Sequence, residues 1–165
     1  MPKLIKDGAI TEDSYVFVSP ADDGSLVLPA SPILVKLSVW QNHRDALLAH
    51  PYAKGVQLAP EEFAEAIAAD LDKLDMIAIE FPGFADGRGY STAHLLRGRL
   101  GFNGELRAVG DVFKDTLFYQ QRCGFNAFVL KGGKSLEEAL SGLKTFTTPY
   151  QTDMCNPKPV FSRQS

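Results

Sequence analysis

A glycine-rich turn that carries one arginine is the sharpest chemical signal in this sequence. Gly87, Arg88 and Gly89 are followed directly by Tyr90 and Ser91. Glycine lets the backbone approach a ligand closely, and the arginine guanidinium forms paired hydrogen bonds with phosphate, sulfate or carboxylate. If a helix begins here, the unpaired N–H groups of its first turn add to the attraction for an anion. These residues therefore predict an anion-binding site.

The same turn also has a purely structural interpretation, in which Arg88 pairs with Asp86 or Asp111 and binds no ligand. The turn is not a dinucleotide fingerprint, because Thr92 stands where the last glycine of GxGxxG would be. It is not a phosphate-binding P-loop either, since no Gly-Lys-Ser/Thr follows it. The sequence leaves the anion-binding and structural interpretations open.

Three carboxylates are candidates for catalysis near this turn: Glu80, Asp86 and Asp111. A carboxylate can act as a general base, and several together can bind a hard cation such as Mg²⁺. In the competing interpretation, Glu80 and Asp86 form ion pairs with Arg88 and Arg107, and Asp111 caps a helix. Capping explains Asp111 well, so we expect no metal site, and no cofactor can be named.

Arg107 is the second cation assigned to the anion site. It alternates with Leu106 and Ala108 in a run that reads as a buried strand. A buried guanidinium needs a charged or hydrogen-bonding partner, because an unpaired buried charge is very costly. That partner is either a bound anion or a carboxylate of the chain.

Composition and charge bound the possible functions. The chain has 165 residues, 45% hydrophobic and 22% charged, and a net charge of −3, which argues against general nucleic-acid binding. Six basic and three acidic residues nevertheless give residues 88–122 a charge of +3. No apolar run approaches the roughly 20 residues of a membrane span, and no signal-peptide core is visible, so a cytoplasmic location is expected. Cys123 and Cys155 show no metal or redox spacing and are expected to be thiols.

The sequence pattern predicts one α/β domain over residues 1–165. Residues 1–32 read as a β-hairpin lead-in, with strands at 15–18 and 26–28 joined by a turn at Asp23-Gly24. Residues 33–144 read as five parallel strands alternating with helices, and 145–165 as an irregular tail. The strands are predicted at 33–37, 55–58, 76–81, 105–109 and 126–130, and the helices at 39–49, 60–74, 91–100, 111–122 and 135–143. Periodicity does not decide between an open three-layer sheet and part of a TIM-like barrel.

Three segments of the chain carry a family resemblance: FADGRGYSTAHLLR, GELRAVGDVFKD and FYQQRCGFNAF. They resemble the signature of a bacterial family of unknown function that is labelled an oxidoreductase of sulfite reduction, because its genes lie beside those for sulfite reductase. The resemblance extends more weakly from about residue 33 to residue 151. Thr116 departs from the family pattern, which more often has glutamine there. The resemblance implies a context of assimilatory sulfur metabolism and supplies no catalytic residues.

Two hypotheses of function follow. In the first, the protein binds an oxyanion or a phosphorylated small molecule at the Gly87–Ser91 turn and acts as an accessory factor or enzyme of sulfite assimilation. In the second, it is a non-catalytic module that docks on sulfite reductase or a neighbouring enzyme through the cationic segment 88–122. No redox cofactor motif is visible, so the oxidoreductase label has no support from the residues. The tail could wrap a second subunit, which leaves a homo-oligomer open.

Overall fold

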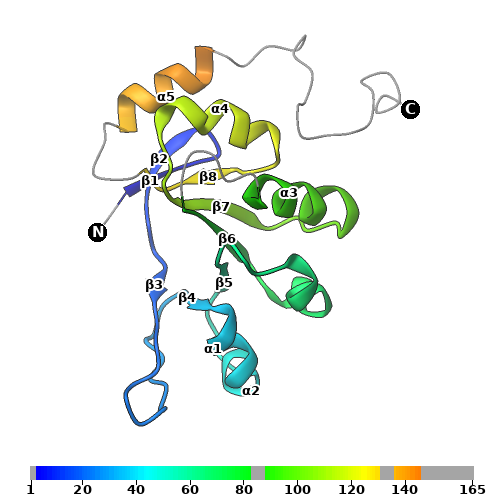
Figure 1. Ribbon diagram of the computed structural model, residues 1–165. Helices are drawn as coiled ribbons and strands as arrows, with labels where there is room; N and C mark the ends of the chain where they lie inside the picture. The colour runs from blue at the N-terminus through cyan, green and yellow to red at the C-terminus, as the bar shows by residue number, and fades with distance from the viewer. Residues whose placement is uncertain (1–2, 83–87, 131–135, 146–165) are drawn as a thin grey trace.

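An eight-stranded mixed sheet, curled into half a barrel, forms the centre of the protein (Figure 1). The computed structural model describes residues 3–82, 88–130 and 136–145. The strands are β1 (Lys3–Lys6), β2 (Ala9–Glu12), β3 (Val16–Phe17), β4 (Ile33–Lys36), β5 (Lys54–Leu58), β6 (Met76–Phe81), β7 (Glu105–Gly110) and β8 (Ala127–Phe128).

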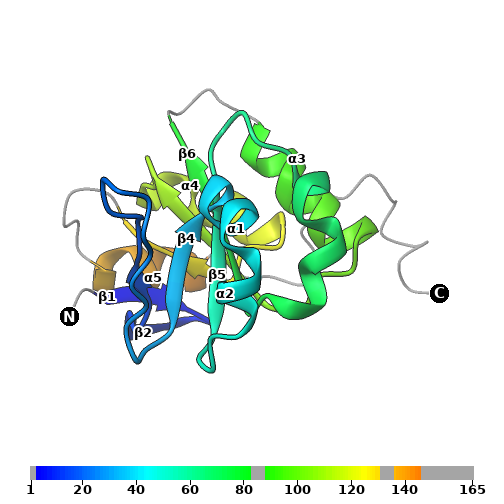
Figure 2. The same ribbon diagram turned by 90° about the horizontal axis from the view of Figure 1, so that it is seen from below.

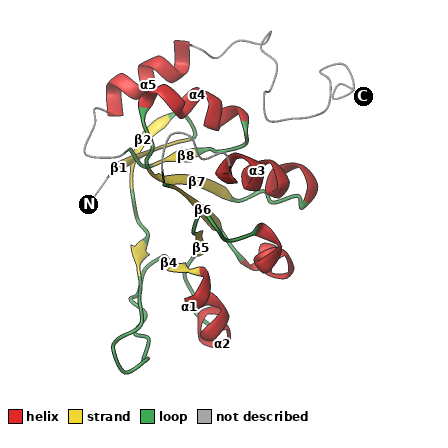
Figure 3. Cartoon of the chain, viewed as in Figure 1, coloured by secondary structure: helices red, strands yellow, loops and turns green. Residues whose placement is uncertain are grey.

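Short helices connect the parallel strands from β4 to β8, and a last helix follows β8. They are α1 (Leu37–Asn42), α2 (Arg44–Leu48), the 3₁₀ helix η1 (Ala64–Lys73), α3 (Arg88–His94), the π-helical segment η2 (Leu95–Arg99), α4 (Lys114–Arg122) and α5 (Leu136–Thr145). In Figure 3 the helices lie around the outside of the strands. In Figure 2, α1 lies beside β4 and β5, which it also contacts.

The strand order explains why the sheet curls. It is β2-β1-β8-β7-β6-β5-β4-β3, and every pair from β3 to β8 is parallel. From β4 onward each parallel strand lies beside the one before it in sequence, so right-handed crossovers place successive helices on the same side. A sheet covered by helices on one side curls around its other side, as in a TIM-like barrel. The α/β prediction is confirmed, and the barrel-like alternative is the one observed.

The two faces of the sheet have different compositions. The outer, helix-covered face carries the main core, in which Ile77, Ile79 and Leu106 are at most 2% exposed. The inner face has a smaller apolar cluster of Leu34, Met76 and Ala78, with Tyr15 and Val109 packed against it. Side chains alternate between faces along a strand. The inner face of β7 therefore also carries Glu105 and Arg107, which lie between the outward-facing core residues.

The N-terminal hairpin exists, but the predicted residues were wrong. The antiparallel pair is β1–β2, joined at Asp7-Gly8 with φ of 52° and 80°, both in the left-handed region that a tight hairpin turn requires. β1 also pairs antiparallel with β8. Of the predicted strands, 15–18 contributes β3, which pairs in parallel with β4, and 26–28 is not a strand. Asp23-Gly24 forms a turn as expected, but the segments on its two sides do not pair as a hairpin.

Two predicted helices differ in their bounds. The helix expected at 39–49 is two helices, α1 and α2, separated by the non-helical His43. The helix expected from residue 60 begins at Ala64, after a turn in which the backbone N–H of Glu62 donates to the carbonyl of Ala59 at 3.0 Å. The later start leaves Phe63 outside the helix and 72% exposed, although its spacing from Ile67 would place both on one face of a helix that ran from residue 60.

The ends of α4 bear on two further predictions. Gly124 follows α4 with φ of 114°, in the left-handed region where glycine commonly ends a helix. The predicted cap at Asp111 is wrong, because α4 begins at Lys114 with Phe113 in the N-cap position. Cys123 is buried, and its sulfur takes part in a disulfide, so the expectation of a thiol is wrong for this residue.

Candidate functional site

A cavity of about 200 Å³ lies between the segment that leads into η1 and helix α3. Two residues of the predicted anion site, Arg88 and Ser91, line it. The other lining residues are Pro60, Glu62, Phe63, Ala64, Glu65, Thr92 and Leu95. Arg88 and Ser91 are exposed, so a ligand in the cavity can reach both side chains.

Gly89 fixes the start of α3 against the sheet. It is buried, and a Cβ atom at this position would lie 2.5 Å from Cε1 of Phe81. Only glycine therefore lets the helix approach β6 this closely. The prediction assigned Gly89 to ligand binding, and the structure gives it a packing role that positions Arg88 and Ser91 beside it.

Tyr90 faces the core and not the cavity. Its ring centroid lies 5.1 Å from that of Phe81 and 4.6 Å from that of Tyr119, which joins α3 to β6 and α4. Burial raises the pKa of Tyr90, and the charge of Tyr119 adds to the shift. Tyr90 therefore anchors α3 to β6 and α4.

Hydroxyls and carboxylates complete the polar lining of the cavity. The Thr92 hydroxyl donates to the carbonyl of Arg88 at 3.0 Å, one turn earlier. Glu62 accepts a hydrogen bond from the backbone N–H of Ala59 at 2.7 Å, so one of its oxygens is already occupied. Glu65 is exposed. The cavity therefore offers a cation and hydroxyls beside α3 and a carboxylate on the other wall.

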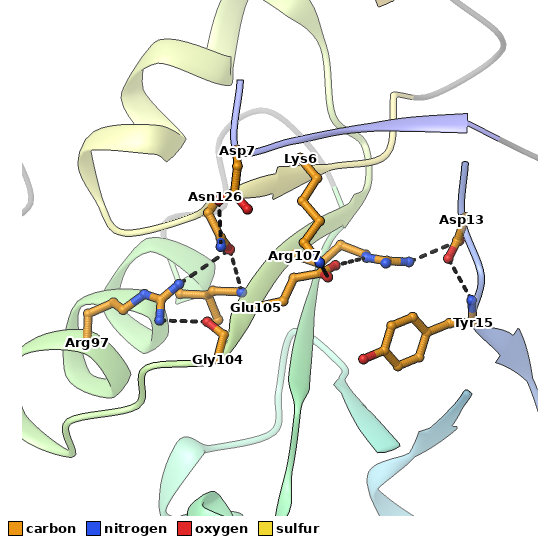
Figure 4. A network of polar contacts seen from close by, with 10 residues as sticks. Lys6, Asp7, Asp13, Tyr15, Arg97, Gly104, Glu105, Arg107 and Asn126 are labelled. Carbon is orange, nitrogen blue, oxygen red and sulfur yellow. Dashed lines mark hydrogen bonds and ion pairs between the residues drawn. The ribbon is translucent and has the colours of Figure 1, made fainter. Parts of the chain in front are cut away.

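Arg107 lies on the inner face of the sheet and is 3% exposed (Figure 4). Its Nε donates to Glu105 at 2.7 Å, and its Nη1 donates to Asp13 at 3.0 Å. Lys6 approaches the other oxygen of Glu105 at 3.0 Å, and the guanidinium lies 5.3 Å from the ring centroid of Tyr15. The partners that the sequence required are therefore carboxylates of the chain, and they tie the N-terminal segment to β7.

Arg97 is a second internal cation, held on the helix side (Figure 4). Its guanidinium donates to the carbonyls of Gly124, Phe102 and Gly104 at 2.8–2.9 Å and to Asn126 at 3.3 Å. Burial lowers its pKa. Because Arg97 and Arg107 are both used internally, the surface of segment 88–122 carries less positive charge than its sequence suggests.

The carboxylate candidates are not gathered in the cavity. Glu80 is on the inner face, since it alternates with Ile79 and Phe81, which belong to the outer core. Asp111 follows β7, and its backbone N–H donates to the carbonyl of Phe81 at 2.7 Å. Asp86 and Gly87 lie outside the described residues. Among the residues that are described, no group of three His, Cys, Asp or Glu side chains is arranged to hold a metal ion.

The predicted site is thus divided between two faces of the sheet. Arg88 and Ser91 share the outer cavity, whereas Arg107 and Glu80 belong to the inner face. Sequence reasoning missed Phe63, which lines the cavity from the opposite wall. Hydrophobic periodicity could not have found it, because the spacing of Phe63 and Ile67 places both on one helix face and does not show where the helix begins.

The fold and the cavity together define an α/β half-barrel with a small cavity of mixed polar and apolar lining on its helical side. Residues 55–161 match the model of a family described as a bacterial protein of unknown function (DUF934), and since this is more than half of the chain, the protein belongs to that family. A comparison with curated proteins found no match. None of the described helices is both long and apolar enough to cross a membrane.

Proposed function

We propose that the protein binds a small oxyanion or a phosphorylated small molecule in the cavity between η1 and α3. The observation that carries this proposal is the presence of Arg88 and Ser91 on one wall of that cavity. A guanidinium and hydroxyls are the side chains that most often hold phosphate and sulfate groups.

The biological context of the proposal is assimilation of sulfite, in which the protein acts as an accessory factor or an enzyme. This part rests on the family resemblance of the three quoted segments. Sulfite, sulfate and sulfate or phosphate esters are the anions of such a context, and each matches the chemistry of Arg88.

The test is a binding measurement by calorimetry and thermal shift with sulfite, sulfate, adenylyl sulfate and phosphate. Wild type is expected to be stabilised by at least one of them, and Arg88→Ala to lose that response. Arg99→Ala is the matched control, because Arg99 is exposed on the adjoining helical segment and does not line the cavity. Equal responses from wild type and Arg88→Ala would overturn the proposal.

A second candidate function is docking on sulfite reductase or a neighbouring enzyme. The observation in its favour is that Arg88 and Arg99 are both exposed on the continuous helical run α3–η2. Association through exposed charges weakens with salt, because ions screen it. A pull-down with sulfite reductase at low and high salt, using the double variant Arg88→Ala/Arg99→Ala, tests this, and no association at low salt would rule it out.

A further inference from the structure

Phe63 is the least expected residue of the cavity. Its side chain is 72% exposed, whereas Ile67, one helical turn later, is fully buried. Burying a phenylalanine ring contributes favourably to folding, so leaving it in water forgoes stability. Core packing therefore does not account for the position of this ring.

The backbone holds Phe63 in this position. Its φ of −106° and ψ of 146° are extended, and it occupies the N-cap position of η1. The preceding turn is fixed by reciprocal hydrogen bonds between Ala59 and Glu62 at 2.7 and 3.0 Å, and the following Ala64 is 1% exposed. The ring is thus presented at the cavity by ordered elements on both sides.

The size of the cavity limits how much of a ligand it can enclose. Its volume of about 200 Å³ is below the roughly 300–1,000 Å³ of typical small-molecule sites. An oxyanion group bound at Arg88 would take up part of this space, and the remainder of an organic ligand would extend toward the apolar wall. Pro60 and Phe63 form that wall, and Leu95 adds an apolar side chain from the helical run that carries Arg88.

We infer that the ligand carries its oxyanion on an aromatic or heteroaromatic body, with the anion at Arg88 and the ring against Phe63. This rests on the proposed function and adds the ligand class. Glu65, exposed on the same wall as Phe63, would repel a second anionic group, so the ligand carries one phosphate or sulfate and not a diphosphate.

Phenyl phosphate, methyl phosphate and pyrophosphate test the inference by calorimetry. Wild type is expected to bind phenyl phosphate about 5-fold or more tightly than methyl phosphate, the size of effect that one aromatic contact provides. Phe63→Ala is expected to lose this preference and keep its affinity for methyl phosphate, and Phe63→Tyr to retain the preference. Phe17→Ala is the matched control, since Phe17 is 45% exposed on β3 and does not line the cavity.

The outcomes separate this inference from the proposed function. Equal affinity of wild type for phenyl and methyl phosphate, with both lost in Arg88→Ala, would overturn the aromatic ligand and leave the anion site standing. A preference that survives in Phe63→Ala would also overturn it. Binding of none of the anions would overturn both. Because Phe63 is exposed, its variants should keep the wild-type circular dichroism spectrum, which is the check on folding.

Discussion

Arg107 and Asp13 lie 94 positions apart in the chain and join their side chains at 3.0 Å. Asp13 belongs to the segment that leads from β2 to β3, and this segment crosses the open side of the half-barrel in Figure 1. The ion pair thus attaches the N-terminal segment to the centre of the sheet, where Glu105 and Tyr15 surround the guanidinium.

Replacing Arg107 with alanine should strongly destabilise the protein. Glu105, which is 6% exposed, would keep only Lys6, and a buried charge that loses its partner costs about 3–5 kcal/mol. Urea unfolding followed by the fluorescence of Trp40 measures the change. Arg99→Ala, which removes an exposed arginine, should stay within about 0.5 kcal/mol of wild type. A loss below ~1 kcal/mol for Arg107→Ala would contradict the assigned role.

Arg97→Lys tests whether the fork of the guanidinium, and not only its charge, is required. A lysine ammonium has no planar fork and cannot reproduce the bonds to the carbonyls of Phe102, Gly104 and Gly124. Leaving these groups unsatisfied should lower the free energy of unfolding by roughly 2–3 kcal/mol. The same measurement on Arg99→Lys supplies the control, and equal stabilities of the two variants would refute the requirement.

Two glycines of one helical run should respond oppositely to alanine. In Gly89→Ala the new Cβ would lie 2.5 Å from the buried Phe81 ring, and such overpacking costs about 1–3 kcal/mol. In Gly98→Ala the nearest atom would be 3.9 Å away, in the side chain of His94, so the higher helix propensity of alanine should leave stability unchanged or raise it by up to about 1 kcal/mol. Thermal unfolding of both variants measures these changes. If Gly98→Ala were destabilised and Gly89→Ala were not, the packing described here would be contradicted.

Tyr15 should make the protein lose stability in strong alkali. Burial, reinforced by the charge of Glu105, raises the pKa of Tyr15 from 10.0 to about 12. The unfolded chain therefore releases this proton first, and the stability that Tyr15 contributes, complete below pH 10, is lost as the pH rises toward 12. Absorbance at 295 nm, with unfolding measured over the same range, should show that Tyr15→Phe removes the late ionisation. An unchanged titration in the variant would disprove the assignment.

Asp70 should show the opposite dependence on pH. The hydrogen bond from Arg44 lowers the pKa of Asp70, and the indole N–H of Trp40 also donates to this carboxylate at 2.8 Å. The stability from the ionised carboxylate is present above its ordinary pKa of 3.8 and is lost as the pH falls below it. Asp70→Asn should flatten this acid dependence in urea unfolding measured from about pH 5 down to about pH 2. If the stability of Asp70→Asn fell with pH in parallel with that of wild type, the role assigned to Asp70 would be wrong.

The parallel half of the fold could be predicted because its strands are continuous apolar runs. The predicted strand 76–81 is β6, with the same bounds. Both faces of this strand are covered, so its sequence is a nearly continuous apolar run that is easy to recognise. The N-terminal hairpin could not be located, because Asp7-Gly8 and Asp23-Gly24 give the same local turn signal. Only the first has flanking residues that become buried against β8, such as Ile5, whereas Val27 beside the second is 81% exposed.

The candidate site was predictable in part for a similar reason. Arg88 and Ser91 carry a local chemical signal, and the structure places them in one cavity. The separation of Arg88 from Arg107 was not predictable. It arises because the helices cover the outer face of the sheet, where Arg88 lies, whereas the N-terminal segment covers the inner face, where Arg107 lies. The need of Arg107 for a partner was visible in the alternation with Leu106 and Ala108, but Asp13 is too distant in the sequence to be recognised as that partner.

The pairing of β1 with β8 has a consequence for how the chain is made. Ile5 pairs with Phe128, so β1 can pair with its antiparallel neighbour β8 only after the intervening strands of the half-barrel have been synthesised. The β4 to β7 strands can associate with their immediate neighbours as they emerge, since each crossover is local. During translation β1 can pair with β2 at once, whereas its other edge stays unpaired until β8 has been synthesised.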